Sequence, residues 1–369
     1  MTMSINGTNG LTFNDASTQN TAATGFGFKN RIINGAMVID QRNAGASFTA
    51  TAASPYSLDR WQVYSNPTAK FSIQQNAGGV TPPAGFSIYA GITSLSAYSV
   101  NTPDSMLLTQ VIEGYNTADL AWGTANAATI TLSFKVYSSL TGTFGGSLQN
   151  YQNTRSYPFT YSIPVANTWT TISVTIPGDT SGTWSTNNTG SILVNFGLGV
   201  GTTRSGTAGA WAAGIYYSAT GAVSVVGTSG ATFYITGVQL EKGSTATTFD
   251  YRPYGTELAL CQRYYAKLTN DGTGSNIAAG SGLQSSTVSA WFYIKYPVTM
   301  RVGPTATISN TQVTNFRSFS VDATLVSIDA GYDFASVRCS MTASGAIDLP
   351  VLLQIKNTLV GFIALSSEL

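Results

Sequence analysis

The run ATITLSFKVY (128–137) decides the fold class of this chain. Apolar side chains alternate in it with polar or amphipathic ones: Ile130, Leu132, Phe134 and Val136 against Thr131, Ser133, Lys135 and Tyr137. A period of two with one apolar face is typical of a strand whose sheet is covered on one side. This pattern predicts antiparallel sheets, because parallel βαβ units need a helix between successive strands.

Five more runs between residues 58 and 254 resemble this one in length and in their β-branched and aromatic content. They are 69–74, 87–92, 169–176, 192–198 and 231–240, each bounded by Gly, Pro, Asn or Asp. We therefore predict a two-sheet β-sandwich of jelly-roll type over 58–254. Residues 29–57 are predicted to be a linker with the first strands, and Asn34-Gly35 indicates a turn inside it.

The segment 255–268 predicts a short connecting helix. Thr256 can cap ELALCQRYYAK (257–267), and Leu258, Cys261 and Tyr265 recur at i, i+3 and i+7 to form one apolar face. A glycine-rich break follows over 270–282, and then a second set of strand-like runs begins. These runs predict a second, small β-sandwich over 269–369: 288–296, 305–309, 316–321, 325–328, 336–342 and 359–364.

Composition excludes several classes of function. Charged residues are 9% of the 369, the formal net charge is +1 and there is no histidine. The chain therefore cannot form Ser-His-Asp or Cys-His triads, and it cannot bind zinc through imidazole. The absence of a Lys/Arg run argues against nucleic acid as a partner, and no apolar run approaches the roughly 18 residues of a membrane span, so no membrane insertion is expected.

The two cysteines lie far apart in the sequence, at Cys261 and Cys339. This is neither a disulfide framework nor the spacing of a metal site. The N-terminal residues carry no signal-peptide pattern, so the chain is expected to fold in a reducing cytoplasm with both thiols buried and unbridged. Residues 1–28 have no sustained period, so they form either a flexible tail or an extended arm that a partner orders; the arm is our prediction.

The string FYITGVQLEKGSTATTFDYRPYGTELALCQRYYAK (233–267) resembles a module widespread in the tail-fibre and related appendage proteins of tailed bacteriophages. NRIINGAMVIDQRNAG (30–45) and YSLDRW (56–61) are similar to the start of the same module, and PVTMRVGPT (297–305) to the C-terminal part of such proteins.

The resemblance implies a homotrimeric fibre of a phage virion, assembled in the cytoplasm of the bacterial host. Residues 1–28 would attach it to other tail, baseplate or adaptor proteins, and residues 269–369 would bind a receptor or hold the trimer together. The sandwich would be of the carbohydrate-binding kind. The resemblance carries over no catalytic residue and implies no cofactor.

The same string gathers arginines, tyrosines and a glutamate at the predicted domain junction. They are Arg252, Tyr254, Glu257, Arg263, Tyr264 and Tyr265. Guanidinium planes against tyrosine rings and carboxylates would fasten the sandwich to the helix. A ligand site built from the same groups is the alternative.

Carboxylates are too scarce to predict an enzyme. Glycan cleavage needs two carboxylates across a cleft, and the chain has four glutamates, two of them in the signature string. Asp329 and Asp333 flank Gly331, which indicates a turn. No metal site is predicted; Asp179, in PGDTSGTW (177–184), is a weak candidate ligand for Ca²⁺ and its alternative is an ordinary turn residue.

Aromatic residues favour sugar binding without catalysis. The chain has 19 Tyr, 6 Trp and little charge, which suits stacking on sugar C–H faces with neutral hydrogen bonds. The candidates in loop-like contexts are Trp184, Trp211, Tyr216 and Tyr217, each with burial in a core as its alternative. The remaining tryptophans, Trp61, Trp122, Trp169 and Trp291, are assigned to cores.

The leading hypothesis is therefore a virion fibre or spike that attaches to host surface polysaccharide without cleaving it, and a tail fibre is the preferred kind. A structural or adaptor protein, such as a head fibre or baseplate component, is the first alternative. A glycan depolymerase is the second.

Overall fold

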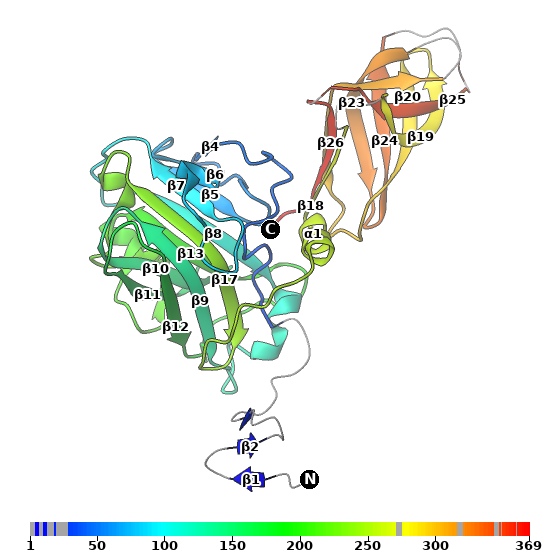
Figure 1. Cartoon of the computed structure of the whole chain (residues 1–369). Helices are drawn as coiled ribbons and strands as arrows, with labels where there is room; N and C mark the ends of the chain where they lie inside the picture. Colours follow the sequence, from blue (N-terminus) through cyan, green and yellow to red (C-terminus); the bar gives the residue numbers. More distant parts are fainter. Residues whose placement is uncertain are drawn as a thin grey trace.

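The chain is nearly all β. The computed structural model describes residues 4–6, 10–12, 18–19, 29–270, 275–315, 320–342, 347, 349–358 and 360–369, and within them a single α-helix, α1 (Tyr254–Gln262). Figure 1 shows a broad sandwich, coloured blue to green, and an elongated C-terminal region in yellow to red, with α1 between them.

Two six-stranded antiparallel sheets form the sandwich. In spatial order the first contains β15 (Ala212–Ala213), β11 (Arg155–Ile163), β10 (Gly142–Asn150), β13 (Gly190–Val200), β8 (Ser105–Glu113) and β5 (Gln62–Asn66). The second contains β12 (Thr170–Ile176), β9 (Ile130–Ser138), β17 (Thr232–Lys242), β7 (Ala90–Ser94), β6 (Phe71–Gln75) and β4 (Phe48–Thr49). The two sheets confirm the predicted all-β sandwich.

Short elements complete the sandwich. A parallel pair joins β14 (Ser205–Gly206) to β16 (Ser218–Ala219). The 3-10 turns are η1 (Ala77–Gly79), η2 (Gly114–Asn116), η3 (Ala118–Leu120), η4 (Thr202–Arg204) and η5 (Val225–Gly227).

The core lies between the two sheets, where the apolar face of β9 points. Phe134 is 1% exposed, and its ring packs edge-on against Phe196 of β13 at 5.1 Å. The other face of β9 carries Ser133, Lys135 and Tyr137 and is partly open. The alternation of 128–137 therefore separates the core from an outer surface of the second sheet.

Two long strands of the sandwich, β8 and β10, carry no alternating signal. The side chains of β8 (SMLLTQVIE) are all buried, because the strand lies inside the first sheet and residues 29–47 cover its outer side. Glycines dominate β10 (GTFGGSLQN), and at Gly146 a Cβ atom would lie 2.6 Å from the ring of Phe159. Close approach of a neighbouring ring, rather than strand propensity, sets the sequence there.

The segment 29–47 contains no strand, in contrast to the predicted strand-like halves around Asn34-Gly35. The turn is present, with Asn34 at φ 58°. The side chain of Asn30 replaces a strand pairing: its Nδ2 donates to the carbonyl of Val238 at 3.0 Å, and its Oδ1 accepts the Leu240 amide at 3.0 Å. Side-chain hydrogen bonds of this kind are not visible in a hydropathy pattern.

The helix is shorter than predicted. It begins after Pro253 and ends at Gln262, so Thr256 lies inside it instead of capping it. Tyr265 is not on the helix, because β18 (Tyr265–Thr269) pairs with β26 (Phe362–Ser366). The pairing with a distant strand overrides the helical spacing of 258–265.

The predicted second sandwich is a closed barrel. Its strands, in order, are β19 (Ile277–Ser286), β20 (Ser289–Lys295), β24 (Phe334–Met341), β23 (Ser320–Ala330), β22 (Thr311–Thr314) and β25 (Pro350–Ile355), which returns to pair with β19. A three-stranded sheet of β18, β26 and β21 (Thr305–Ser309) lies beside it. The glycine-rich β19 and the continuous apolar β25 have no alternation, so the sequence does not show how the sheet closes.

Both cysteines are free and fully buried, as predicted. Cys261, on the buried face of α1, is in a cluster with Tyr264, and Cys339 lies in the barrel core. Burial raises the pKa of both thiols, that of Cys339 to about 12.

Near the N-terminus the structure describes β1 (Ser4–Asn6), β2 (Gly10–Thr12) and β3 (Thr18–Gln19), a small antiparallel sheet. Most of the predicted 1–28 arm lies outside the described residues.

Candidate functional site

The predicted sugar platforms Trp184 and Trp211 pack together, with Trp184 buried and Trp211 partly buried. Their indole rings lie 5.5 Å apart, and both pack edge-on against Trp122 at 4.7 and 5.4 Å. Trp184 is 9% exposed, and the indole N–H of Trp211 donates to the carbonyl of Pro177 at 2.7 Å. The three tryptophans close one end of the core, so the prediction of an exposed platform is wrong for Trp184.

Tyr216 and Tyr217 are half-buried and lie on another loop. The ring of Tyr216 packs against the backbone of Gly206, and Tyr217 lies beside Arg204 at 5.9 Å. Neither extends a surface from Trp184.

Asp179 holds an arginine rather than a cation. Its two carboxylate oxygens accept hydrogen bonds from Nε and Nη2 of Arg155 at 2.7 and 2.8 Å, and Oδ1 also accepts the Ser181 amide at 3.1 Å. Both oxygens are therefore occupied in a buried ion pair. Among the described residues no group of three or more Cys, Asp or Glu could hold a metal ion.

The predicted junction residues make contacts between the sandwich, the helix and the C-terminal region. Arg263 forms a two-pronged pair with Glu113 of β8 at 3.1 and 2.6 Å, and the Tyr264 hydroxyl donates to the same carboxylate at 2.5 Å. Arg252 pairs with Glu257 at 3.2 Å. Tyr254 is 63% exposed and takes no part in these pairs.

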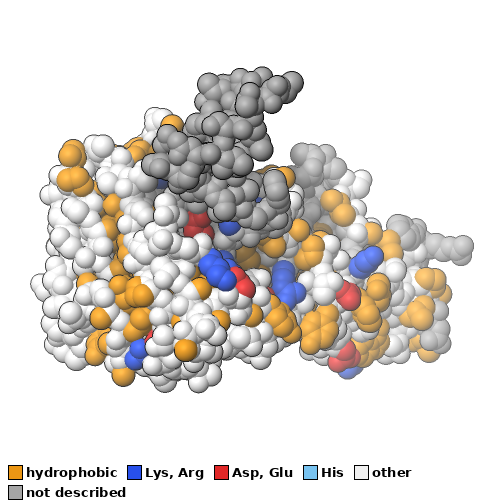
Figure 2. All heavy atoms as spheres, turned by 90° about the horizontal axis from the view of Figure 1, so that it is seen from below, with side chains coloured by type: hydrophobic (Ala, Val, Ile, Leu, Met, Phe, Trp, Pro, Cys, Tyr) orange, Lys and Arg blue, Asp and Glu red, His pale blue; other side chains and the backbone are white. Residues whose placement is uncertain are grey.

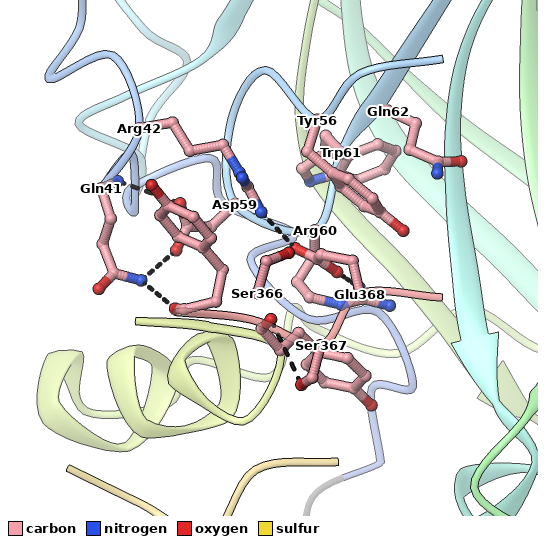
Figure 3. A network of polar contacts seen from close by, with 12 residues as sticks. Gln41, Arg42, Tyr56, Asp59, Arg60, Trp61, Gln62, Ser366, Ser367 and Glu368 are labelled. Carbon is pink, nitrogen blue, oxygen red and sulfur yellow. Dashed lines mark hydrogen bonds and ion pairs between the residues drawn. The ribbon is translucent and has the colours of Figure 1, made fainter. Parts of the chain in front are cut away.

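A second set of junction contacts surrounds Glu368, close to the end of the described chain (Figure 3). Its carboxylate pairs with Arg42 at 2.8 Å and with Arg60, whose side chain is 1% exposed. The guanidinium of Arg60 lies 3.7 Å from the centre of the Tyr264 ring, and that of Arg42 lies 3.5 Å from the centre of the Tyr265 ring. We call Arg42, Arg60, Tyr264, Tyr265 and Glu368 the clasp. The sequence indicates its tyrosines, but its arginines and Glu368 come from distant segments.

Burial shifts the ionisation of groups around the clasp. It raises the pKa of Asp59 to about 6, although hydrogen bonds from Gln41 oppose the shift. It also raises the pKa of the Tyr264 hydroxyl. Both shifts arise from loss of water at a packed interface; Asp59 accepts hydrogen bonds from Gln41, and Tyr264 donates one to Glu113.

All four glutamates hold other parts of the chain in this way. Glu113 and Glu257 pair with arginines at the junction, and Glu368 is part of the clasp. Glu241 accepts the Thr247 amide at 2.9 Å and the Thr247 hydroxyl at 2.7 Å. Their oxygens are engaged in structural bonds.

An open groove of about 540 Å³ lies on the outer face of the second sheet. Its floor consists of outward side chains of the edge strand β12 and of its neighbour β9: Thr171 and Ser173, and Ser133 and Lys135. The register places Ser133 opposite Ser173 and Lys135 opposite Thr171. Lys135 Nζ donates to the Thr171 hydroxyl at 2.9 Å.

Three aromatic rings form one wall of the groove. Phe86 contacts Phe249 at 5.1 Å and Tyr251 at 5.4 Å, and Phe249 contacts Tyr251 edge-on at 4.8 Å. We call these three residues the aromatic wall. The Tyr251 hydroxyl donates to the carbonyl of Gly85, which links the loop after β17 to the loop before β7. Tyr251 is 56% exposed, so an aromatic ring is available to a ligand.

Gly237 allows this wall to stand where it does. Its φ is 62°, at the irregularity where β17 shifts register against β9. A Cβ atom at this position would lie 2.6 Å from the ring of Phe86. Only glycine combines this backbone conformation with this approach at no cost.

The outer face continues past the groove into a second group of aromatic side chains. Two residues beyond Lys135 and two before Thr171 lie Tyr137 and Trp169, with ring centres 5.5 Å apart. Tyr137 stacks on Tyr234 at 5.3 Å. The outer surface from Ser173 to Trp169 extends over four residues along the chain, which is about 13 Å. Trp169 packs against the small buried cluster of Ala77, Tyr89 and Tyr234 but is itself only partly buried, as is Trp291 of the barrel.

The groove combines flat apolar rings with neutral hydroxyls and one cation. Such a surface can stack against the C–H faces of a sugar and bond its hydroxyl groups. The sequence shows the floor, since Ser133 and Lys135 are on the polar face of 128–137. It does not show the aromatic wall, because Phe86 and Phe249 belong to loops that the sheet alone brings together.

No protein-family model and no curated protein matches this chain. The similar solved structures include the enzymatically active domain of bacteriophage CBA120 tailspike protein 4 (12% identity, TM-score 0.33), with 58% of this chain and 21% of that chain covered. A family 11 carbohydrate-binding module from Clostridium thermocellum, solved with a mixed-linked tetrasaccharide, covers 54% of this chain and 98% of its own (13% identity, TM-score 0.28). An exo-β-agarase covers 74% of this chain and 41% of its own (9% identity, TM-score 0.28). This chain spans about a fifth of the tailspike domain.

The surface agrees with the composition in having little charge. The face in Figure 2 shows mostly uncharged side chains, with scattered Lys, Arg, Asp and Glu. Within the described part of the chain, no helix is long and apolar enough to cross a membrane.

Proposed function

We propose that this chain is a non-catalytic fibre protein of a phage virion, a tail fibre by preference over other fibres and spikes, and that it attaches to host surface glycans through the groove on its second sheet. One observation carries the glycan part: an exposed aromatic wall beside a floor of serine and threonine hydroxyls, in a groove of about 540 Å³. The virion part is supported by the resemblance of residues 233–267 to phage appendage proteins.

The groove also supports binding without cleavage. Among the described residues that line it there is no Asp or Glu, and Lys135 is the charged one. Hydrolysis of a glycosidic bond uses a pair of carboxylates. The glutamates that a depolymerase would need are bonded inside the protein.

The C-terminal region would serve the assembled fibre. The barrel exposes large apolar side chains on its outside; Tyr293 and Phe334, half-exposed, lie 5.2 Å apart. We propose that residues 269–369 bury such surface in a homotrimer and that residues 1–28 dock on other virion proteins. Light scattering of the purified chain tests the trimer, and a monomer mass at micromolar concentration contradicts it.

Adhesion to bacteria tests the function. The labelled full chain is mixed with a panel of bacterial strains, and the fraction bound is compared with that of a Phe249→Ala/Tyr251→Ala variant. Tyr115→Ala is the matched control, because Tyr115 is 63% exposed and lies outside the groove. We expect the wall variant to lose adhesion and the control to keep it, each with an unchanged melting temperature.

Two other results identify the alternatives. Adhesion to no strain, with the protein present in the virion, indicates a structural or adaptor component. Release of reducing sugar from surface polysaccharide indicates a depolymerase.

A further inference from the structure

Lys135 is the one cation among the described residues that line the groove, and Lys29 donates to the hydroxyl of the lining residue Thr247. Lys135 lies at the end of the floor that is nearest the aromatic side chains of Tyr137 and Trp169. The other polar floor groups are hydroxyls of serine and threonine. In a chain with 9% charged residues, a lysine in the lining of the candidate site is a specific feature of its chemistry.

Lys135 has no carboxylate partner among the described residues. Its ammonium group donates to the Thr171 hydroxyl at 2.9 Å, and it takes part in none of the ion pairs of the described chain. Its cross-strand neighbour on the other side, Thr236, turns its hydroxyl to the backbone carbonyl of Ile88 at 2.8 Å. An ammonium group has three donors, so donors remain for a ligand in the groove.

Several arginines of the sandwich, unlike Lys135, are paired with carboxylates, whereas Lys70 and Arg204 lie over tyrosine rings. Arg31 pairs with Asp119, Arg155 with Asp179 and Arg252 with Glu257. A surface lysine on a sheet is ordinarily solvated. Here the hydrogen bond to Thr171 positions the ammonium group of Lys135 at the groove floor. The chemistry that complements this position is an anionic oxygen.

We infer that the groove binds an acidic saccharide, one that carries a carboxylate such as a uronic or sialic acid, with the carboxylate at Lys135 and the neighbouring sugar faces on the aromatic wall. This inference rests on the proposed function and specifies its ligand class. A charge-assisted hydrogen bond at this position strengthens binding by about tenfold or more over a neutral ligand of the same shape.

Matched pairs of oligosaccharides test the inference. The probes are oligogalacturonate, an oligoglucuronate and 3′-sialyllactose, each paired with its carboxyl-reduced neutral form, and binding to the full chain is measured by calorimetry. We expect an acidic probe to bind at least about tenfold tighter than its reduced form, and the preference to shrink as salt rises. Lys135→Gln should abolish the preference, and Lys135→Arg should retain most of it.

Lys295→Gln is the control for net charge. Lys295 is exposed on the barrel and lies outside the groove, so its replacement removes one positive charge and should leave the preference unchanged. If the reduced probes bind as tightly as the acidic ones and Lys135→Gln changes nothing, the inference is wrong while glycan binding stands. If Lys295→Gln weakens acidic binding as much as Lys135→Gln does, the preference is general electrostatics and the inference is wrong. If neither set of probes binds, the inference and the proposed groove both fail.

Discussion

Removing Glu368 should weaken the attachment of the C-terminal region to the sandwich. In Glu368→Ala, Arg60 keeps its full charge at a position where its side chain is 1% exposed. Loss of one partner of a buried ion pair costs about 3–5 kcal/mol, because the remaining charge is uncompensated. The carbonyl of Val111, which accepts from Arg60 at 2.6 Å, and the Tyr264 ring still offset part of this cost. We therefore expect a loss near the lower end, about 3 kcal/mol.

Urea unfolding of the full chain, followed by tryptophan fluorescence, measures this change. Asp322→Asn is the matched control: it also breaks an ion pair of the C-terminal region, with Lys356, but its side chain is 78% exposed. An exposed pair is worth about 0–1 kcal/mol. The double variant Arg60→Met/Glu368→Leu removes both charges and should recover most of the lost stability. The reasoning is refuted if Glu368→Ala costs no more than Asp322→Asn, or if the double variant is less stable than Glu368→Ala.

Three further outcomes follow from other parts of the structure. Burial raises the pKa of Asp59 from 3.8 to about 6, so the native chain binds more protons than the unfolded chain between these pH values. The free energy of unfolding should therefore fall as pH rises from about 4 to 6. Urea titrations at several pH values measure this fall, and Asp59→Asn should remove it. Gly237→Ala puts a Cβ atom at φ 62° and 2.6 Å from the Phe86 ring, so it should lower the free energy of unfolding by about 1–2 kcal/mol or more in the same assay and weaken adhesion. Adhesion equal to that of the native chain would show that the position of the aromatic wall does not matter for binding. Cys261 and Cys339, both 0% exposed, should be unreactive to a thiol reagent until denaturant is added and should then both react; reaction in the native state would contradict their burial.

Alternation predicts the fold where one face of a strand is buried and the other is open. This is the case for β9, whose polar and apolar faces are read directly from residues 128–137. It fails for β8 and β25, because side chains on both faces of β8 are buried and β25 is largely apolar. It fails at α1 as well, where a helical spacing crosses into β18 and only the distant strand β26 decides the outcome.

The candidate site was predictable in its floor but not in its walls. Lys135 is visible as an outward residue in the sequence, whereas Phe86 and Phe249 are separated by most of the sandwich sequence and meet only because β7 and β17 are neighbours. The loop context of Trp184 predicted an exposed ring, but the ring is buried. Its indole N–H donates to the carbonyl of Ser181 at 3.1 Å, and the ring packs against Trp122. A loop position does not fix the direction of a side chain.

The position of a bound sugar tests the central claim most directly. Crystals of the full chain are soaked with an oligosaccharide from the surface polysaccharide of a strain to which the protein adheres. We expect a sugar ring within about 4.5 Å of Tyr251 or Phe249, with its polar groups toward Lys135 and Thr171. A sugar bound at the barrel, or at the Trp184–Trp211 cluster, with the groove empty would contradict the claim.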